Sequence, residues 1–160
     1  MGCDDCSEAL TDTRDAASPE SFFRMVNERH VPISATLELT YRCNLHCVHC
    51  YCVVDGQRTP DELTTDEWKG VLDQLAAAGT LSASFTGGDP FLRKDVWEIA
   101  EHARTRRFAL RFLTNASFFN DANADRLARL KPASVSISLY GATPETYERV
   151  TGRASFHEKT

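Results

Sequence analysis

The sequence predicts an α/β fold built on parallel strands. Runs typical of strands begin near residues 36, 81, 108 and 134, and a helical pattern separates each run from the next. Strands that are joined through helices run parallel, with right-handed crossovers. A polar or glycine-rich motif follows each run, and in parallel α/β folds the chemistry lies at the carboxyl ends of the strands. We therefore expect the functional residues to lie together at one edge of the sheet, where the strands end.

Length and composition indicate one domain with a hydrophobic core. The chain has 160 residues, of which 42% are hydrophobic and 26% are charged, and its net charge of −5 gives no electrostatic footprint for nucleic acid. No apolar run approaches the ~20 residues of a membrane span, and the N-terminus lacks the pattern of a secretory signal. Six cysteines, three of them clustered, favour a reducing cytoplasm over a disulfide scaffold. We expect a cytoplasmic protein without nucleic-acid or membrane partners.

The first 35 residues precede the predicted sheet. Residues 1–18 are polar and acidic without periodicity, which is typical of a disordered tail. Cys3 and Cys6 have C-x-x-C spacing, which indicates either a metal or redox pair or, as we favour because no further ligand is near, two free thiols. Ser18 followed by proline predicts a helix start, so residues 19–35 are expected to form a helix and a lead-in to the first strand.

The later elements follow from capping and periodicity. Thr64 and Glu67 match a capping box, and Gly79 ends the helix that it begins. Val96, Trp97, Ile99, Ala100 and Ala103 are expected on the buried side of the next helix. The expected strands after the first are residues 81–86, 108–114 and 134–140, and the expected later helices are residues 94–104 and 120–130, with another helix starting at Glu145.

Three clustered cysteines follow the first strand. Cys43, Cys47 and Cys50 have C-x3-C-x2-C spacing, and three thiolates can hold three irons of a [4Fe–4S] cluster, which normally takes four. An iron without a protein ligand corresponds to the open position of catalytic metal sites. The spacing therefore favours a reactive cluster. A zinc site with His46 or His49, or thiols that bind nothing, remain the alternatives.

The run R-C-N-L-H-C-V-H-C-Y around these cysteines resembles the signature loop of the radical S-adenosylmethionine (radical SAM) enzymes. The resemblance implies that SAM chelates the fourth iron and that one electron from the cluster cleaves SAM to a 5′-deoxyadenosyl radical, which abstracts hydrogen from a substrate. It also implies a flavodoxin- or ferredoxin-like electron donor. Cys52 adjoins the loop but breaks the spacing, and we interpret it as a bystander.

The turn after the second strand extends the resemblance. Gly87, Gly88 and Asp89 resemble the family's Gly-Gly-Glu turn, which meets the amino group of the methionine moiety, although the aspartate is one methylene shorter. Glycine permits close backbone approach, and a carboxylate suits an ammonium partner. Taken alone, the same residues would indicate a plain strand-to-helix turn. His49 matches the position that packs beside the adenine.

Three further residues match positions near the cofactor in relatives. Asn115 lies in T-N-A, where relatives have T-N-G, and is expected to line the site. Ser138 in I-S-L-Y-G and Arg149 in Y-E-R-V-T-G match positions that hold polar groups of the cofactor. A guanidinium matches a carboxylate through two hydrogen bonds, but an arginine on a helix is more often simply solvated. No catalytic side chain can be assigned from the sequence.

The resemblance also implies an incomplete core. The family core is a partial (β/α)6, TIM-like barrel, and at ~30 residues per unit residues 36–160 supply about four units. We therefore expect a truncated core domain from the N-terminal part of a longer enzyme. The segments E-L-T-Y-R-C-N and I-S-L-Y-G-A-T-P-E-T-Y-E-R-V-T-G resemble the SPASM-associated branch, which implies a peptide or protein substrate. The alternative is a non-catalytic iron–sulfur or zinc-binding interaction module.

Overall fold

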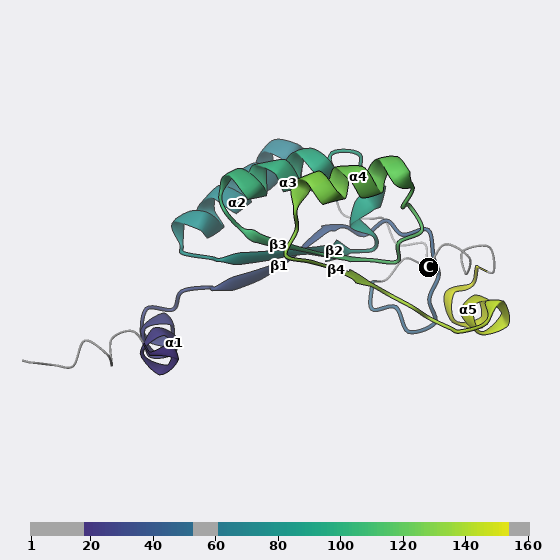
Figure 1. Cartoon of the computed structure of the whole chain (residues 1–160), viewed down its shortest axis with the longest axis horizontal. Helices are drawn as coiled ribbons and strands as arrows, with labels where there is room; N and C mark the ends of the chain where they lie inside the picture. Colours follow the sequence, from purple (N-terminus) through teal and green to yellow (C-terminus); the bar gives the residue numbers. More distant parts are fainter. Residues whose placement is uncertain (1–17, 53–60, 154–160) are drawn as a thin grey trace, which may run out of the picture.

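The computed structural model describes residues 18–52 and 61–153. The predicted tail at residues 1–18, with Cys3 and Cys6, lies outside the described residues except for Ser18. Figure 1 shows one layer of helices on a single sheet, with further helices beyond the two ends of the strands.

The sheet contains four parallel strands in the order β1-β2-β3-β4, which confirms the predicted fold class. Sequential order places each β/α unit beside the next, as in a partial barrel. The strands are β1 (Ser34–Thr40), β2 (Ser82–Gly87), β3 (Ala109–Thr114) and β4 (Ser134–Ile137). β4 is shorter than the expected residues 134–140. Its last ladder pair joins Ile137 to Thr114, after which the Ser138 N–H still donates to the Thr114 carbonyl over 3.0 Å.

Helices α2 (Thr65–Ala77), α3 (Val96–Thr105) and α4 (Asp121–Leu130) cover one face of the sheet (Figure 1). The predicted capping box of α2 is present, because the Thr64 side chain accepts from the Glu67 N–H and the Glu67 side chain accepts from the Thr64 N–H. The Asn120 side chain caps α4 by accepting from the N–H of Asn123. Within the described residues, no helix has the length and apolar character that a membrane span requires.

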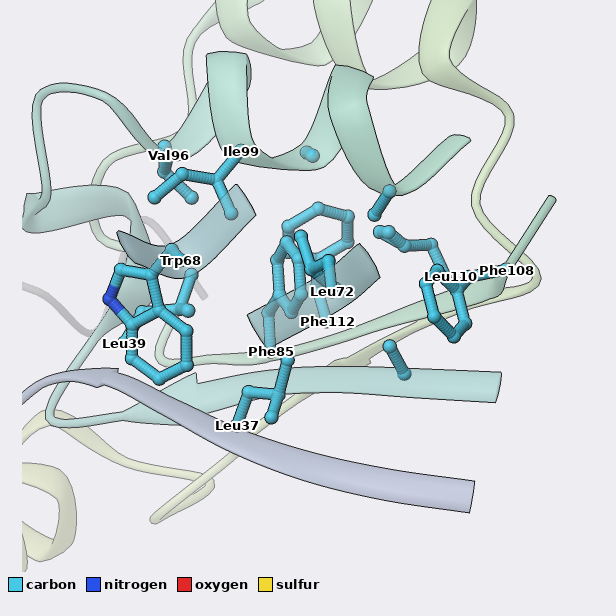
Figure 2. Close-up of a cluster of buried hydrophobic side chains, with 13 residues drawn as sticks. Leu37, Leu39, Trp68, Leu72, Phe85, Val96, Ile99, Phe108, Leu110 and Phe112 are labelled. Atoms are coloured by element: carbon cyan, nitrogen blue, oxygen red, sulfur yellow. The ribbon is translucent and has the colours of Figure 1, made fainter. Parts of the chain in front are cut away.

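The core lies between these helices and the sheet (Figure 2). Side chains alternate between the two faces of each strand. In β3, Leu110 and Phe112 are buried against the helices, whereas Ala109, Arg111 and Leu113 point to the opposite, open face. The buried cluster contains Leu37, Leu39, Trp68, Leu72, Ala83, Phe85, Val96, Ile99, Ala100, Ala103, Phe108, Leu110 and Phe112.

One residue of the predicted core lies at its margin. Trp97 is only partly buried, and the Arg126 guanidinium lies over its ring at 5.0 Å from the centroid. The indole therefore serves as a platform between α3 and α4 rather than as a core side chain.

Two helices lie beyond the ends of the strands. α1 (Pro19–Glu28) precedes β1, and its Ser18 cap and first-turn proline confirm the predicted helix start. α5 (Pro144–Thr151) follows β4 and lies beyond the carboxyl ends of the strands (Figure 1). A short 3-10 helix, η2 (Pro90–Leu92), follows β2.

Candidate cofactor site at the carboxyl ends of the strands

A pocket of about 200 Å³ lies at the carboxyl ends of the strands. Its walls come from residues 41–52, here called the cysteine loop, and from the ends of β2, β3 and β4. Most side chains predicted from the sequence line this pocket, namely Cys43, Cys47, His49, Cys50, Gly87, Gly88, Asn115 and Ser138. Asp89 and Arg149 are not among its lining residues. Leu45, Tyr51, Cys52, Thr86, Leu113, Thr114 and Tyr140 complete the described lining.

Backbone hydrogen bonds to α5 hold the cysteine loop in place. The His46 N–H donates to the Thr151 carbonyl and the Val48 N–H to the Val150 carbonyl, each over 2.9 Å. The apolar side chain of Leu45 is 2% exposed, and its burial also holds the loop. The three thiols are therefore presented by a segment that is tied to the end of the chain's last described helix. This contact joins residues about a hundred positions apart and has no local sequence signal.

The two glycines allow the turn after β2 to lie directly against the start of the cysteine loop. The Gly88 N–H donates to the Thr40 carbonyl over 2.7 Å. A Cβ on Gly87 would lie 2.1 Å from the Thr40 oxygen, and one on Gly88 would lie 2.2 Å from the Arg42 oxygen. Gly87 also has a φ of +122°, in a region that favours glycine. A side chain on Gly87 would therefore push against the end of β1, and one on Gly88 against the start of the cysteine loop.

Asp89 is fully buried, and its carboxylate is occupied by internal hydrogen bonds. Oδ1 accepts from the Phe91 N–H over 3.0 Å, and Oδ2 accepts from the Thr114 hydroxyl over 2.7 Å and from the Asn115 N–H over 2.9 Å. Burial raises the pKa of this carboxyl, against the lowering effect of these donors. The structure thus places Asp89 beneath the pocket, where it joins the glycine turn to the end of β3.

Asn115 is 5% exposed and reaches the cysteine loop. Its Nδ2 lies 3.7 Å from the Cys43 sulfur and 3.0 Å from Oδ1 of Asn44. Ala116, which follows it, has a φ of +61°. This left-handed conformation is the physical reason that glycine suits this position, and the alanine here adopts it in spite of its Cβ.

Tyr140 lines the pocket, although the sequence predicted only its place at a strand end and no contact with a cofactor. Its ring centroid lies 5.3 Å from that of His49 and 6.1 Å from that of Tyr147. Burial raises the pKa of the Tyr140 hydroxyl and of the Cys47 thiol, and the hydrogen bond between these two groups partly offsets the rise in the pKa of Cys47. Its position just after the end of β4 was the available signal, because side chains at strand ends face the functional edge.

Burial raises the pKa of both the Cys43 and the Cys47 thiols, so a metal must displace their protons when it binds. Burial also raises the pKa of Cys52 to about 11, and its sulfur lies 3.4 Å from the Gly87 carbonyl, to which the thiol donates. Cys52 therefore has a partner of its own, and its interpretation as a bystander remains a prediction.

The three clustered thiols share one pocket. In the two described segments of the chain, no three His, Cys, Asp or Glu side chains are grouped as one metal ion requires. Cys43, Cys47 and Cys50 line the same pocket, and three thiolates can hold three irons of a [4Fe–4S] cluster. Arg149 is exposed on α5.

A buried arginine fixes the end of β1. Arg93, which is 5% exposed, donates to the carbonyls of Leu39 and Leu63 over 3.0 and 2.6 Å and pairs with Asp95. Beside it, Glu62 accepts from the Thr40 hydroxyl. The end of β1, where the cysteine loop begins, is therefore held by two side chains from outside the strand.

Comparisons with known proteins agree with this geometry. The Radical SAM superfamily matches residues 37–160 of the chain. The mycofactocin maturase MftC of Mycobacterium ulcerans (strain Agy99) is 40% identical over 125 residues, which cover 78% of this chain and 34% of that protein. The PqqA peptide cyclase of Bradyrhizobium diazoefficiens is 37% identical over 129 residues, which cover 81% of this chain and 34% of that protein. The chain thus spans about a third of the length of these curated relatives.

A solved structure shows the same fold. The crystal structure of Streptococcus suis SuiB bound to S-adenosylmethionine matches 85% of this chain and 32% of that chain, with a TM-score of 0.69 and 18% identity. At this identity the likeness concerns the fold alone.

Proposed function

Because this chain belongs to the radical SAM superfamily, we propose that Cys43, Cys47 and Cys50 hold a [4Fe–4S] cluster and that SAM binds beside it. These are the cofactors of the family. When bound, they supply one-electron cleavage of SAM for radical hydrogen abstraction, and the protein positions and shields them. One observation carries the proposal. Three thiols of a single loop and a turn made of two glycines line the same pocket.

The other pocket residues have positioning roles in this proposal. The backbone of Gly87 and Gly88 forms a side-chain-free wall against which the methionine moiety can lie. His49, whose ring is already in contact with Tyr140, presents an aromatic surface for the adenine. Ser138 offers a hydroxyl at the same rim.

Two predicted SAM contacts remain predictions. Asp89 is enclosed by its three donors, which favours a role in holding the glycine turn over direct contact with the methionine ammonium. Arg149 is exposed and outside the pocket lining, so contact with SAM would depend on the reach of its long side chain.

We propose a peptide or protein substrate. The support is the names of the relatives: one matures mycofactocin and another is a cyclase of the PqqA peptide. Electrons would come from a flavodoxin- or ferredoxin-like donor. The proposed cluster has a coordination position open to SAM, and its cysteine thiols must stay reduced. Both features favour a cytoplasmic location.

Anaerobic reconstitution of the 160-residue chain with iron and sulfide tests the proposal. We expect broad visible absorption, a reduced [4Fe–4S]⁺ signal by electron paramagnetic resonance, and a change in that signal when SAM is added. Bound zinc with no such spectrum would support the non-catalytic zinc-binding module instead. A cluster whose signal ignores SAM would support a non-catalytic iron–sulfur module.

A further inference from the structure

We propose that the side-chain amide of Asn115 donates to the Cys43 sulfur and raises the reduction potential of the cluster, and that Asp89 is the positioning residue for this amide. The inference rests on the proposed function, because Cys43 must be a cluster ligand. It assigns to two residues a role other than direct contact with SAM.

The hydrogen bonds around Asn115 determine which end of its amide faces the sulfur. Oδ1 accepts from the Ser117 N–H over 2.9 Å, and a backbone N–H cannot act as an acceptor. Nδ2 is therefore directed to the Cys43 sulfur at 3.7 Å and to Oδ1 of Asn44 at 3.0 Å. Asn44 is fixed in turn, because its Nδ2 donates to the Ser117 hydroxyl over 2.8 Å. A flipped Asn115 amide would place donor against donor at Ser117.

Asp89 fixes the backbone from which this amide projects. Its Oδ2 accepts both the Asn115 N–H and the hydroxyl of Thr114, and the same hydroxyl accepts from the Ala116 N–H over 3.0 Å. The carboxylate thus holds Thr114, the last residue of β3, and Asn115 directly, and Ala116 through the Thr114 hydroxyl. Asp89 is a positioning residue in this proposal because its carboxylate holds that backbone; its negative charge alone would oppose the addition of an electron to a nearby cluster.

The expected electronic effect follows from charge. Reduction adds an electron to the cluster and its sulfur ligands, so N–H groups directed at a ligand sulfur favour the reduced form. The Cys43 sulfur already accepts from the Leu45 N–H over 3.4 Å, and Asn115 supplies a second donor from a buried position where screening by water is weak. Removal of the Asn115 donor should make the cluster harder to reduce.

Redox titration of the reconstituted chain, followed by electron paramagnetic resonance, provides the test. Asn115→Asp keeps the shape but replaces the donor by a negative acceptor. At the wild-type midpoint we expect the ratio of reduced to oxidised cluster to fall about tenfold, as for the loss of a hydrogen bond to a charged group. Asn115→Ala, which removes the donor without adding charge, should shift the ratio in the same direction. Asn123→Asp on α4 adds the same charge at another asparagine and should leave the ratio unchanged.

The outcomes separate this inference from the function on which it rests. Wild-type protein that binds no cluster overturns the proposed function. If the clusters of the wild type and of the Asn115 variants have equal reduction midpoints, the inference is overturned but the proposed function is not. Loss of the cluster from both Asn115 variants, with circular dichroism showing a retained fold, also overturns it, because Asn115 would then serve cluster assembly rather than its potential.

Discussion

The carboxylate of Asp89 accepts a hydrogen bond from the hydroxyl of Thr114 over 2.7 Å, and this contact joins the glycine turn after β2 to the end of β3. Both residues are buried, at 0% and 4% exposure. Two walls of the cofactor pocket are therefore connected beneath the pocket, so a change at Asp89 is expected to affect the fold before it affects any bound group.

Asp89→Asn should lower the free energy of unfolding of the cofactor-free chain by about 1–3 kcal/mol, the cost of leaving a buried donor without a partner. Its two oxygens accept from the N–H groups of Phe91 and Asn115, so the new NH₂ faces a backbone donor in either orientation. The raised pKa means that the buried charge is itself costly, but its removal does not restore the lost acceptor. Urea denaturation gives the measurement.

Asp121→Asn, at an exposed position in the first turn of α4, is the matched control and should change stability little. An Asp89→Asn protein as stable as the wild type, with weaker SAM binding after reconstitution, would instead support direct contact between Asp89 and SAM.

Gly88→Ala should destabilise the chain by about 1–3 kcal/mol, because the added methyl group overpacks the backbone of the cysteine loop. Its Cβ would lie 2.2 Å from the Arg42 oxygen and 2.8 Å from the Tyr41 oxygen, so the loop must move and iron binding should fall as well. Thermal unfolding and iron content measure the two effects.

Gly70→Ala is the control with the opposite expected sign. Gly70 lies inside α2 with nothing within 4 Å of its added Cβ, so alanine should stabilise the chain by about 1 kcal/mol through helix propensity. Equal effects of the two substitutions would mean that close approach to the cysteine loop is not what requires glycine at Gly88.

Asp73 should make stability sensitive to acid. Hydrogen bonds from Arg106 and His102 hold the pKa of this carboxyl below its usual value of 3.8. A depressed pKa in the folded state contributes stability that is present above 3.8 and is lost as the pH falls through the folded value. The difference in unfolding free energy between wild type and Asp73→Asn should therefore be constant near neutral pH and shrink in acid.

Denaturant melts across this pH range measure that difference. Asp125→Asn, at an exposed position on α4, gives the baseline for loss of a surface carboxylate. An Asp73→Asn difference that stays unchanged down to the lowest pH would show that Arg106 and His102 do not favour the ionised carboxylate.

Local patterns predicted most of the fold. The capping box at Thr64, the proline start at Ser18 and the alternation of strand and helix depend on neighbouring residues, and each is present. The end of β4 was misjudged, because Ser138 and Tyr140 keep a strand-like pattern although they turn to line the pocket. Strand propensity does not distinguish a paired residue from one at a functional rim.

The sequence predicted those parts of the site whose position follows from the spacing of residues along the chain. It did not predict the parts that depend on contacts between side chains far apart in the sequence. The spacing of the cysteines and the pair of glycines identified the pocket walls. The side-chain direction of Asp89 depends on donors from β3, some 25 positions later, and no local pattern encodes that contact. The same holds for the buried Arg93, whose hydrogen-bond partners come from β1 and from the segment before α2.

Iron and acid-labile sulfide per chain, measured after anaerobic reconstitution of single cysteine variants, test the central claim most directly. Cys43→Ala, Cys47→Ala and Cys50→Ala should each lose the [4Fe–4S] content of the wild type, because each removes one of only three thiolate ligands. Cys52→Ala should retain this iron and sulfide content, since the Cys52 thiol donates a hydrogen bond to the Gly87 carbonyl. Full iron content in Cys47→Ala together with loss in Cys52→Ala would contradict the assignment of the cluster ligands.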